Sequence, residues 1–350
     1  MKAAILYDDR DIRPGDARDP AIGPDEVLVS SGYAGICGTD LHIYRGEFKD
    51  RVKYPAIQGH EFGGTVLELG KDVMGLRVGD RVVVDPIISC HACPACLTGR
   101  INACKTLKLL GVDLDGGYGQ AVAVPASHIL PLPESIPMEY APMVELYGIA
   151  HHVLQRGAVQ LGESVIILGA GKVGLSVIDV LCHHSGPGLV FAADVHDFRL
   201  ALARKLGADH VVNVNREDPV ERVMALTGGI GVDCVIEAIG HFHEIPGREA
   251  PLQQAARMVR SGGRIVTVGM GDQFSAVHFK TLVLKEALLI ASRVTCGEFP
   301  RAIRIMAKGL LHPELLVTHK MTMREVAAAF AKVDREEPET IKIVLDIQAG

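Results

Sequence analysis

The feature that most constrains the fold is a series of apolar runs of strand length between residues 164 and 291. Segments of helical periodicity separate most of these runs. Strands that alternate with helices in this way form a parallel sheet with helices on both faces, which is an α/β fold. The runs are Ser164–Leu168, Leu189–Ala193, His210–Val214, Val232–Glu237, Arg264–Val268 and Ala287–Ala291, and the helical segments include Lys172–His184 and Phe198–Leu206.

A glycine motif joins the first predicted strand to the first predicted helix. In such a motif the first glycine allows a tight turn, the second lets the backbone approach a pyrophosphate, and the third lets helix and strand pack closely. The helix N-terminus then offers free N–H groups to the phosphates. An ordinary tight turn is the competing interpretation. The motif predicts a dinucleotide site formed by Gly169, Gly171, Lys172, Val173 and Gly174.

An acidic residue at the end of the next strand indicates which dinucleotide binds. Asp194 lies twenty residues after Gly174. A carboxylate at this place accepts hydrogen bonds from the adenosine ribose and repels a 2′-phosphate. His196 and Arg199 follow, but no pair of basic residues comes directly after Asp194. We therefore expect NAD rather than NADP, with Asp194 and Arg199 in the cofactor site.

Four of the eight cysteines lie within one short segment with the spacing C-x2-C-x2-C-x7-C. Four thiolates around a tetrahedral zinc leave no open coordination position, so this site would stabilise a loop and would not bind substrate. Disulfides are disfavoured in a reducing compartment. An iron–sulfur cluster uses similar spacings, although nothing else in the sequence indicates electron transfer. The segment predicts a structural zinc bound by Cys90, Cys93, Cys96 and Cys104.

Length and charge narrow the class of protein. A chain of 350 residues is long enough for two domains, and the formal net charge of -6 gives no indication of nucleic-acid binding. The N-terminal segment lacks the features of a secretory signal, and no apolar run approaches the ~20 residues that span a bilayer. We expect a cytoplasmic protein without a nucleic-acid or membrane partner.

A second metal site is indicated in the first third of the chain. The segment CGTDLH includes Cys37, Thr39 and His42, and the segment GHEF contains His60 and Glu61. Cysteine and histidine, completed by a third protein ligand, form an open zinc site that retains a position for water or substrate. Taken singly, Cys37 and His60 are equally consistent with packed core residues.

The motifs CGTDLHIY, GHEFGGTV, DGGYGQ and LGAGKVG occur together with the spaced cysteines, in an order that resembles the zinc-dependent medium-chain alcohol dehydrogenases. The resemblance covers essentially the whole chain and is strongest to the sorbitol/polyol and threonine dehydrogenase branches. It implies a GroES-like, β-rich catalytic domain over 1–152, a Rossmann NAD-binding domain with a doubly wound parallel sheet over 153–292, and a return to the catalytic domain over 293–350.

The same resemblance implies the ligands of a catalytic zinc, which would be Cys37, His60 and a third group at Glu145. Simple alcohol dehydrogenases have cysteine at that place, whereas the polyol and threonine branches have glutamate, usually followed by proline where this chain has Leu146. Glu61 resembles a family glutamate that enters and leaves the zinc shell. Which of Glu61 and Glu145 binds zinc in the resting enzyme stays open, as does a helix-capping role for Glu145. The chain would thus hold two zinc ions.

The resemblance also implies a proton relay. Thr39 would hydrogen-bond the substrate oxygen, and the proton would pass through the nicotinamide ribose to His42, while Asp40 would orient His60. The alternative places Thr39 and Asp40 in a turn and His42 on the surface.

Substrate identity is less constrained. Arg293 lies where polyol dehydrogenases carry an arginine near substrate and nicotinamide, and Tyr44 is a second candidate for a pocket contact; a surface ion pair and core packing are the alternatives. A polar site favours oxidation of a polyol, sugar alcohol or sugar acid. Amino-alcohol oxidation, as in L-threonine 3-dehydrogenase, and a non-catalytic NAD sensor are the competing functions.

Two features concern assembly. The apolar run Ala287–Ala291 would be a natural pairing edge in a homodimer or homotetramer. The segment 241–251, HFHEIPGREAP, departs from both branches, and it would either cover the cofactor or contribute to an interface.

Overall fold

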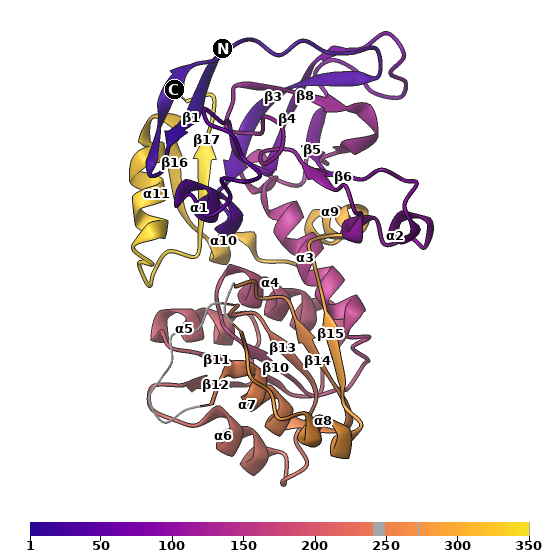
Figure 1. The fold of residues 1–350 in the computed structure, drawn as a ribbon, viewed down its shortest axis with the longest axis vertical. Coiled ribbons are helices and arrows are strands. Elements are labelled where there is room, and N and C mark those ends of the chain that lie inside the picture. Colours follow the sequence, from indigo (N-terminus) through magenta and orange to yellow (C-terminus); the bar gives the residue numbers. More distant parts are fainter. Residues whose placement is uncertain (241–248, 272–273, 350) are drawn as a thin grey trace. The chain divides into compact units, whose positions relative to one another are not determined.

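The computed structural model describes residues 1–240, 249–271 and 274–349, so most of the 241–251 segment lies outside the described residues. The chain divides into two compact units (Figure 1). Unit 1 comprises Met1–Gly148, Thr295–Gly309 and Pro313–Gly350. Unit 2 comprises Ile149–Val294 and Leu310–His312.

Unit 2 contains the predicted parallel sheet, and the expectation of an α/β nucleotide-binding fold is confirmed. The strand order is β12-β11-β10-β13-β14-β15, and every neighbouring pair is parallel. The chain moves outward from β10 in one direction and then restarts beside it with β13, which is the doubly wound arrangement. The strands are β10 (Val165–Leu168), β11 (Val190–Asp194), β12 (His210–Asn213), β13 (Val232–Glu237), β14 (Val259–Thr267) and β15 (Leu288–Ala291).

Helices lie against both faces of this sheet (Figure 1). The apolar strand residues Phe191, Val235 and Ile265 are fully buried, and they share a core cluster with side chains from α6, α7 and α8. Burial on both faces explains why these strands are continuous apolar runs. The helices are α4 (Lys172–Val180), α5 (Asp197–Lys205), α6 (Pro219–Leu226), α7 (Pro251–Met258) and α8 (Phe279–Lys285).

The first helix of unit 2 differs from the prediction at its end. The periodicity predicts one helix over Lys172–His184, but the regular helix α4 ends at Val180 and a π-helical turn, Leu181–Ser185, follows. Gly186 closes this turn in the left-handed conformation, with φ of 57°.

Unit 1 is built on a seven-stranded, mostly antiparallel sheet in the order β16-β17-β3-β4-β5-β9, with β8 also paired to β3. The C-terminal strand β17 pairs with β3, so that Val344 lies opposite Gly35. The start of β17 therefore lies beside the loop that follows β3, where the Ile36 N–H donates to the Ile343 carbonyl at 3.0 Å. The strands are β3 (Glu26–Gly35), β4 (Glu61–Leu69), β5 (Arg81–Val84), β8 (Ala121–Pro125), β9 (Ile129–Pro131), β16 (Val317–Thr322) and β17 (Lys342–Asp346).

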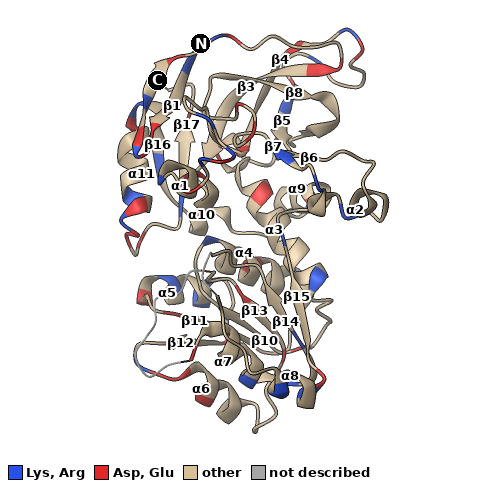
Figure 2. Ribbon diagram, in the orientation of Figure 1, with Lys and Arg blue, Asp and Glu red and all other residues tan. Residues whose placement is uncertain are grey.

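Shorter strands and several helices complete the chain. Acidic and basic residues are interspersed along both units (Figure 2). Among the described residues, no helix is both long enough and apolar enough to span a membrane. The remaining elements include β1 (Lys2–Asp8), β2 (Asp11–Asp16), α1 (Gly38–Tyr44), β6 (Ile87–Ile88), α2 (Pro94–Leu97), β7 (Lys108–Leu109), α3 (Met143–Arg156), α9 (Phe299–Ala307), α10 (Pro313–Leu316) and α11 (Val326–Asp334).

Candidate metal centres and nucleotide site

Three of the residues expected to bind a catalytic metal converge in unit 1. One potential ligand atom from each of Cys37, His60 and Glu61 lies within 4.8 Å of the others. Gly35 pairs with Glu61 across β3 and β4, which brings the loops at the ends of these strands together. Cys37 is the N-cap of α1, and its N–H donates to the Asp40 carboxylate at 2.8 Å. The start of a short helix thus fixes the position of the thiol.

Asp40 forms an ion pair with His60. The Asp40 side chain has no solvent exposure, and its Oδ1 lies 3.5 Å from His60 Nδ1. The Tyr118 hydroxyl contacts the other carboxylate oxygen at 3.1 Å, and Gln58 Nε2 donates to the Asp40 carbonyl at 3.1 Å. Burial alone would lower the pKa of His60, but Asp40 and Cys37 raise it well above its ordinary value. Asp40 therefore stabilises a proton, or another positive charge, on this imidazole.

Glu145 contributes a second buried carboxylate. It lies in the first turn of α3 and is 4% exposed. Burial, followed by repulsion from Glu61, raises the pKa of Glu145 from 4.5 to about 8, and His60 opposes this shift. Among the described residues, neither Glu145 Oε2 nor Glu61 Oε1 has a hydrogen-bond partner. Two enclosed carboxylates with unpaired oxygens are costly unless a cation or a proton lies between them.

Lys342 on β17 was not anticipated as a site residue. Its ammonium group contacts Glu61 Oε2, and both side chains are fully buried. It also donates to the Ile36 carbonyl at 3.2 Å. Burial would lower the pKa of Lys342, but Glu61 and Cys37 raise it. Lys342 therefore neutralises one oxygen of Glu61 and leaves the other oxygen available.

This donor set fits zinc. A thiolate, an imidazole and carboxylates are the ligands that zinc binds in proteins. The unpaired oxygens of Glu61 and Glu145 are buried beside Cys37 and His60, where a divalent cation would offset their charge. Cys37, His60, Glu61 and Glu145 are therefore the residues that could hold a metal here.

Thr39 and His42 both lie in α1, three residues apart, and so share one face of the helix. His42 Nδ1 lies 2.5 Å from Glu47 Oε2, and its ring stacks on Phe48 with centroids 6.0 Å apart. Tyr44 is only 8% exposed and its ring packs against Phe330, which favours the core-packing alternative over a contact in a substrate pocket.

The four spaced cysteines converge as a separate cluster, with one sulfur from each within 4.8 Å of the others. The Cys93–Cys96 and Cys90–Cys96 sulfurs are 3.5 Å and 3.9 Å apart. Sulfurs around a tetrahedral zinc are about 3.8 Å apart, given Zn–S bonds of about 2.3 Å. The backbone N–H groups of Ala92 and Cys93 lower the pKa of Cys90 to about 6, which favours its thiolate. Cys104 completes a set suited to a closed zinc site.

The glycine motif of unit 2 joins β10 to α4, and its glycines meet distinct requirements. Gly169 has φ of +93°, which disfavours other residues. A Cβ on Gly174 would lie 1.8 Å from the Gly169 carbonyl oxygen. Gly171 is the N-cap of α4. Apart from its chain neighbours and the helix backbone, a Cβ at this position would have no described atom within 4 Å. Gly174 is therefore required for packing, whereas Gly171 leaves space open at the helix N-terminus.

Asp194 lies at the end of β11, facing this loop. Its Oδ2 accepts the Ala170 N–H at 2.8 Å, its Oδ1 accepts the His196 N–H at 2.9 Å, and Arg199 Nη1 is 3.8 Å from Oδ2. The carboxylate is thus held in a fixed orientation at the glycine loop.

Arg293 follows β15 and is exposed.

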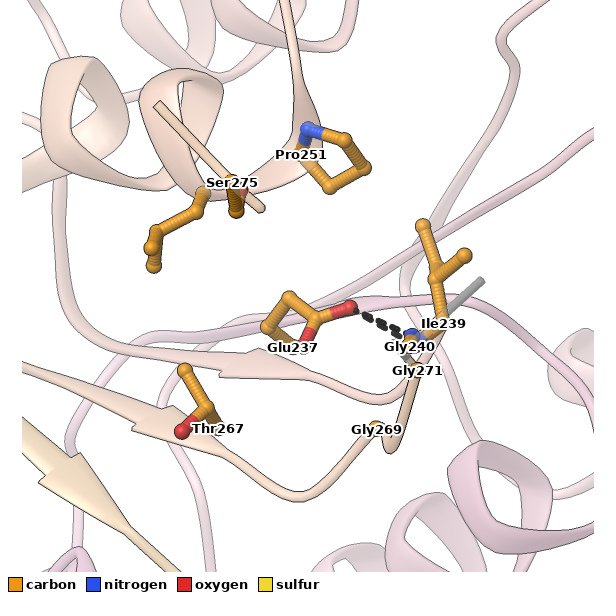
Figure 3. A pocket seen from close by; sticks show the side chains of 9 residues that line it. Glu237, Ile239, Gly240, Pro251, Thr267, Gly269, Gly271 and Ser275 are labelled. Carbon is orange, nitrogen blue, oxygen red and sulfur yellow. Dashed lines mark hydrogen bonds between the residues drawn. The ribbon is translucent and has the colours of Figure 1, made fainter. Parts of the chain in front are cut away.

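A small pocket lies at the carboxyl ends of β13 and β14 (Figure 3). Its volume is about 160 Å³, and its lining includes Glu237, Thr267 and Ser275. Glu237 is 8% exposed and accepts the N–H groups of Ile239 at 2.8 Å and Gly240 at 3.0 Å. Ligands of doubly wound sheets bind at this edge. Glu237 therefore shapes the turn that borders the pocket.

Known proteins match the chain in both units. The family "Alcohol dehydrogenase GroES-like domain" matches residues 23–134, and "Zinc-binding dehydrogenase" matches residues 173–308. L-threonine 3-dehydrogenase of Pyrococcus horikoshii is 38% identical over 306 residues, covering 86% of this chain and 85% of the relative. Sorbitol dehydrogenase of Bacillus subtilis is 30% identical over 349 residues, covering 99% of this chain and 97% of the relative.

A solved structure agrees with these matches. The alcohol dehydrogenase rspB from E. coli, complexed with NADH, superposes with a TM-score of 0.91 and 34% identity over 99% of each chain. The resemblance read from the sequence motifs is confirmed: this chain belongs to the zinc-dependent medium-chain alcohol dehydrogenase superfamily and is an oxidoreductase.

Proposed function

We propose that the chain oxidises a secondary hydroxyl of a polyol, sugar alcohol or sugar acid to the ketone, with zinc as catalytic metal and NAD as hydride acceptor. The observation that carries this proposal is the convergence of Cys37, His60 and Glu61 beside the buried Glu145. A thiolate, an imidazole and exchangeable carboxylates hold zinc and keep one position open for an alcohol.

The chain's own residues prepare this centre. Cys37, His60 and Glu145 would hold the zinc, which would supply a Lewis acid that lowers the pKa of the substrate hydroxyl. Asp40 lies 3.5 Å from His60 Nδ1 and would orient the imidazole. Lys342 contacts Glu61 Oε2 and would orient that carboxylate, whose other oxygen is available to the metal.

Proton transfer would be the role of α1. Thr39 would hydrogen-bond the substrate oxygen, and His42 would take up the released proton at its ring. The 2.5 Å contact of His42 Nδ1 with Glu47 supports this role, since the carboxylate fixes the orientation of the ring. The remaining ring nitrogen is then the one that exchanges protons with the site.

NAD would bind at the glycine loop of unit 2. Gly169, Gly171, Lys172, Val173 and Gly174 would surround the pyrophosphate at the start of α4. The fixed Asp194 carboxylate would accept ribose hydroxyls and disfavour the 2′-phosphate of NADP, with Arg199 beside it. The NADH complex of the rspB protein supports this cofactor assignment.

The substrate class rests on the polarity of the metal centre. Carboxylates from Glu61 and Glu145 suit a substrate with several hydroxyls, and Arg293 would add a donor. The sorbitol dehydrogenase relative supports this choice. Oxidation of L-threonine is the second candidate, because the L-threonine 3-dehydrogenase relative is 38% identical.

The assembly would be a homodimer or homotetramer in the cytoplasm. Strand β15 ends the sheet of unit 2, and its Leu288 and Leu289 are 57% and 43% exposed. Val283 and Leu284 of α8 are also exposed. An apolar strand edge of this kind is suited to pairing with a second copy.

Cys90, Cys93, Cys96 and Cys104 would hold the second, structural zinc.

A substrate screen tests this proposal. Purified enzyme is mixed with NAD or NADP and with sorbitol, other polyols, sugar acids, L-threonine or simple alcohols, while nicotinamide absorbance is followed. We expect the highest kcat/KM with a polyol or sugar acid and NAD. Higher kcat/KM with L-threonine would replace the substrate assignment, and a preference for NADP would overturn the role of Asp194.

A further inference from the structure

Unit 2 contains a cluster of potential metal ligands apart from the residues discussed so far. It consists of Asp179 on α4, His183 in the π-helical turn and His312 in the segment Leu310–His312. Asp179 Oδ1 lies 3.1 Å from His183 Nδ1 and 2.9 Å from His312 Nδ1. Two imidazoles from different parts of the chain thus meet at one carboxylate oxygen.

Local structure holds the carboxylate in place. The Asp179 side chain has no solvent exposure, and its Oδ2 accepts the His312 N–H at 2.8 Å. Asp179 and His183 are four residues apart, a spacing that places them on one face of a helix. The turn between them is π-helical, a form that often occurs at functional sites.

The geometry is close to that of a zinc site. Ligand atoms around a tetrahedral zinc are about 3.3 Å apart, given bonds of about 2.0–2.1 Å to nitrogen and oxygen. The two measured distances are slightly shorter, and one ligand atom from each residue lies within 4.8 Å of the others. Small movements of the two rings would therefore accommodate a cation between them.

The cluster is also accessible to a metal ion. The side chains of His183 and His312 are 32% and 35% exposed, so their rings border solvent while the carboxylate beneath them is buried. A cation held by two nitrogens and one oxygen keeps a position for water. Imidazole with carboxylate selects zinc, cobalt or nickel over calcium and magnesium, which prefer oxygen ligands alone.

We propose that Asp179, His183 and His312 bind a third divalent cation of the zinc type, in unit 2. This site is separate from the cysteine cluster and from the Cys37 centre, and it adds a metal-dependent constraint between α4 and the segment Leu310–His312. The competing interpretation is that both rings only donate hydrogen bonds to Asp179.

Metal content tests the site in the full-length protein. Wild type, His312→Asn and His183→Asn are incubated with excess ZnCl2, dialysed against micromolar zinc, and analysed for zinc per chain. We expect one more zinc in the wild type than in either variant. His278→Asn removes a histidine of unit 2 outside the cluster and should match the wild type. Equal zinc in all four proteins would overturn the proposal.

Cobalt distinguishes this site from the cysteine sites and from misfolding of a variant. Cobalt bound by thiolates gives an intense near-ultraviolet charge-transfer band, whereas a histidine and carboxylate site gives only weak visible bands. We expect wild-type protein that holds zinc only at the cysteine cluster and the Cys37 centre to bind one cobalt ion with visible bands and no thiolate band, and this ion to be lost in His312→Asn. A variant that retains the cobalt, or wild-type protein that binds none, would refute the site.

Discussion

Lys342 and Glu61 form an ion pair in which neither side chain is exposed to solvent. The pair lies beside Cys37, and a Cβ on Gly35 would meet both side chains. The C-terminal strand thus supplies the charge that balances a carboxylate of the candidate metal centre. Because removal of one partner leaves an uncompensated buried charge, this relationship can be tested by stability.

Replacement of Lys342 by methionine should lower the free energy of unfolding by about 3–5 kcal/mol, because Glu61 would be left buried without its cation. Urea denaturation measures this loss. Lys320→Met is the matched control: its pair with Glu139 is 49% and 30% exposed, so the loss should stay below about 1 kcal/mol. Equal, small losses in both variants would contradict the role of Lys342.

Glu145 should make the metal-free protein less stable as pH rises. Its pKa is raised from 4.5 to about 8, so between these values the folded state binds a proton that the unfolded state has lost. The contribution of Glu145 to the free energy of unfolding should then fall by about 1.4 kcal/mol per pH unit.

Comparison with Glu145→Gln isolates this contribution. The other titrating groups are the same in both proteins, so their effect on the pH dependence of the free energy of unfolding cancels in the difference. Denaturation of chelator-treated wild type and variant from pH 5 to pH 8 provides the measurement, and Glu134→Gln, at an exposed position, is the control. The difference between wild type and Glu145→Gln should shift steadily with pH. A constant difference would mean that Glu145 is not a buried, proton-binding carboxylate.

Two alanine substitutions in the glycine loop should affect different properties of the protein, one its stability and the other its affinity for NAD. Gly174→Ala should destabilise the protein by about 1–3 kcal/mol, since its Cβ would lie 1.8 Å from the Gly169 oxygen. Gly171→Ala should change stability by less than about 0.5 kcal/mol, because the Cβ enters open space. Its NAD affinity should nevertheless fall about tenfold, or about 1.4 kcal/mol, as the methyl group occupies the approach of the pyrophosphate. Thermal denaturation and NADH titration separate the two effects, and unchanged NADH affinity in Gly171→Ala would exclude this loop as the phosphate site.

His42→Ala should lower turnover at neutral pH by about tenfold or more, because the proton acceptor on α1 is lost. Turnover should recover partly at higher pH, where hydroxide removes the proton. The test is the pH profile of kcat, with His319→Ala as a histidine control in the same unit. A variant whose profile matches the wild type would rule out a proton relay through His42.

Apolar runs located the six strands of the sheet in unit 2, because strands buried on both faces must be apolar along their whole length. Val232–Glu237 was predicted with the observed bounds, and the first residue of α4 was predicted from the glycine loop. The end of α4 was missed, since a π-helical turn keeps helical periodicity while changing the hydrogen bonding.

The site was less predictable where function depends on burial of a charge. In IKIVLDI, Lys342 alternates with apolar residues and so is typical of a solvent-facing strand position, yet it is fully buried against Glu61. Tyr118 lies within the DGGYGQ motif, but only the fold shows its hydroxyl at Asp40. For Tyr44 the sequence leaves a pocket contact and core packing open, because an aromatic residue near a ligand segment is typical of both, and only the fold shows its packing against Phe330.

We propose that the Cys37 centre supports oxidation of a hydroxyl by NAD. The most direct measurement is the rate of NADH formation by zinc-loaded wild type and Cys37→Ser with a polyol panel, L-threonine and simple alcohols. We expect substrate-dependent NADH formation in the wild type and its loss in Cys37→Ser, with NADH affinity retained. A wild-type protein that holds zinc and binds NADH but oxidises none of these substrates would contradict the claim and indicate an NAD sensor.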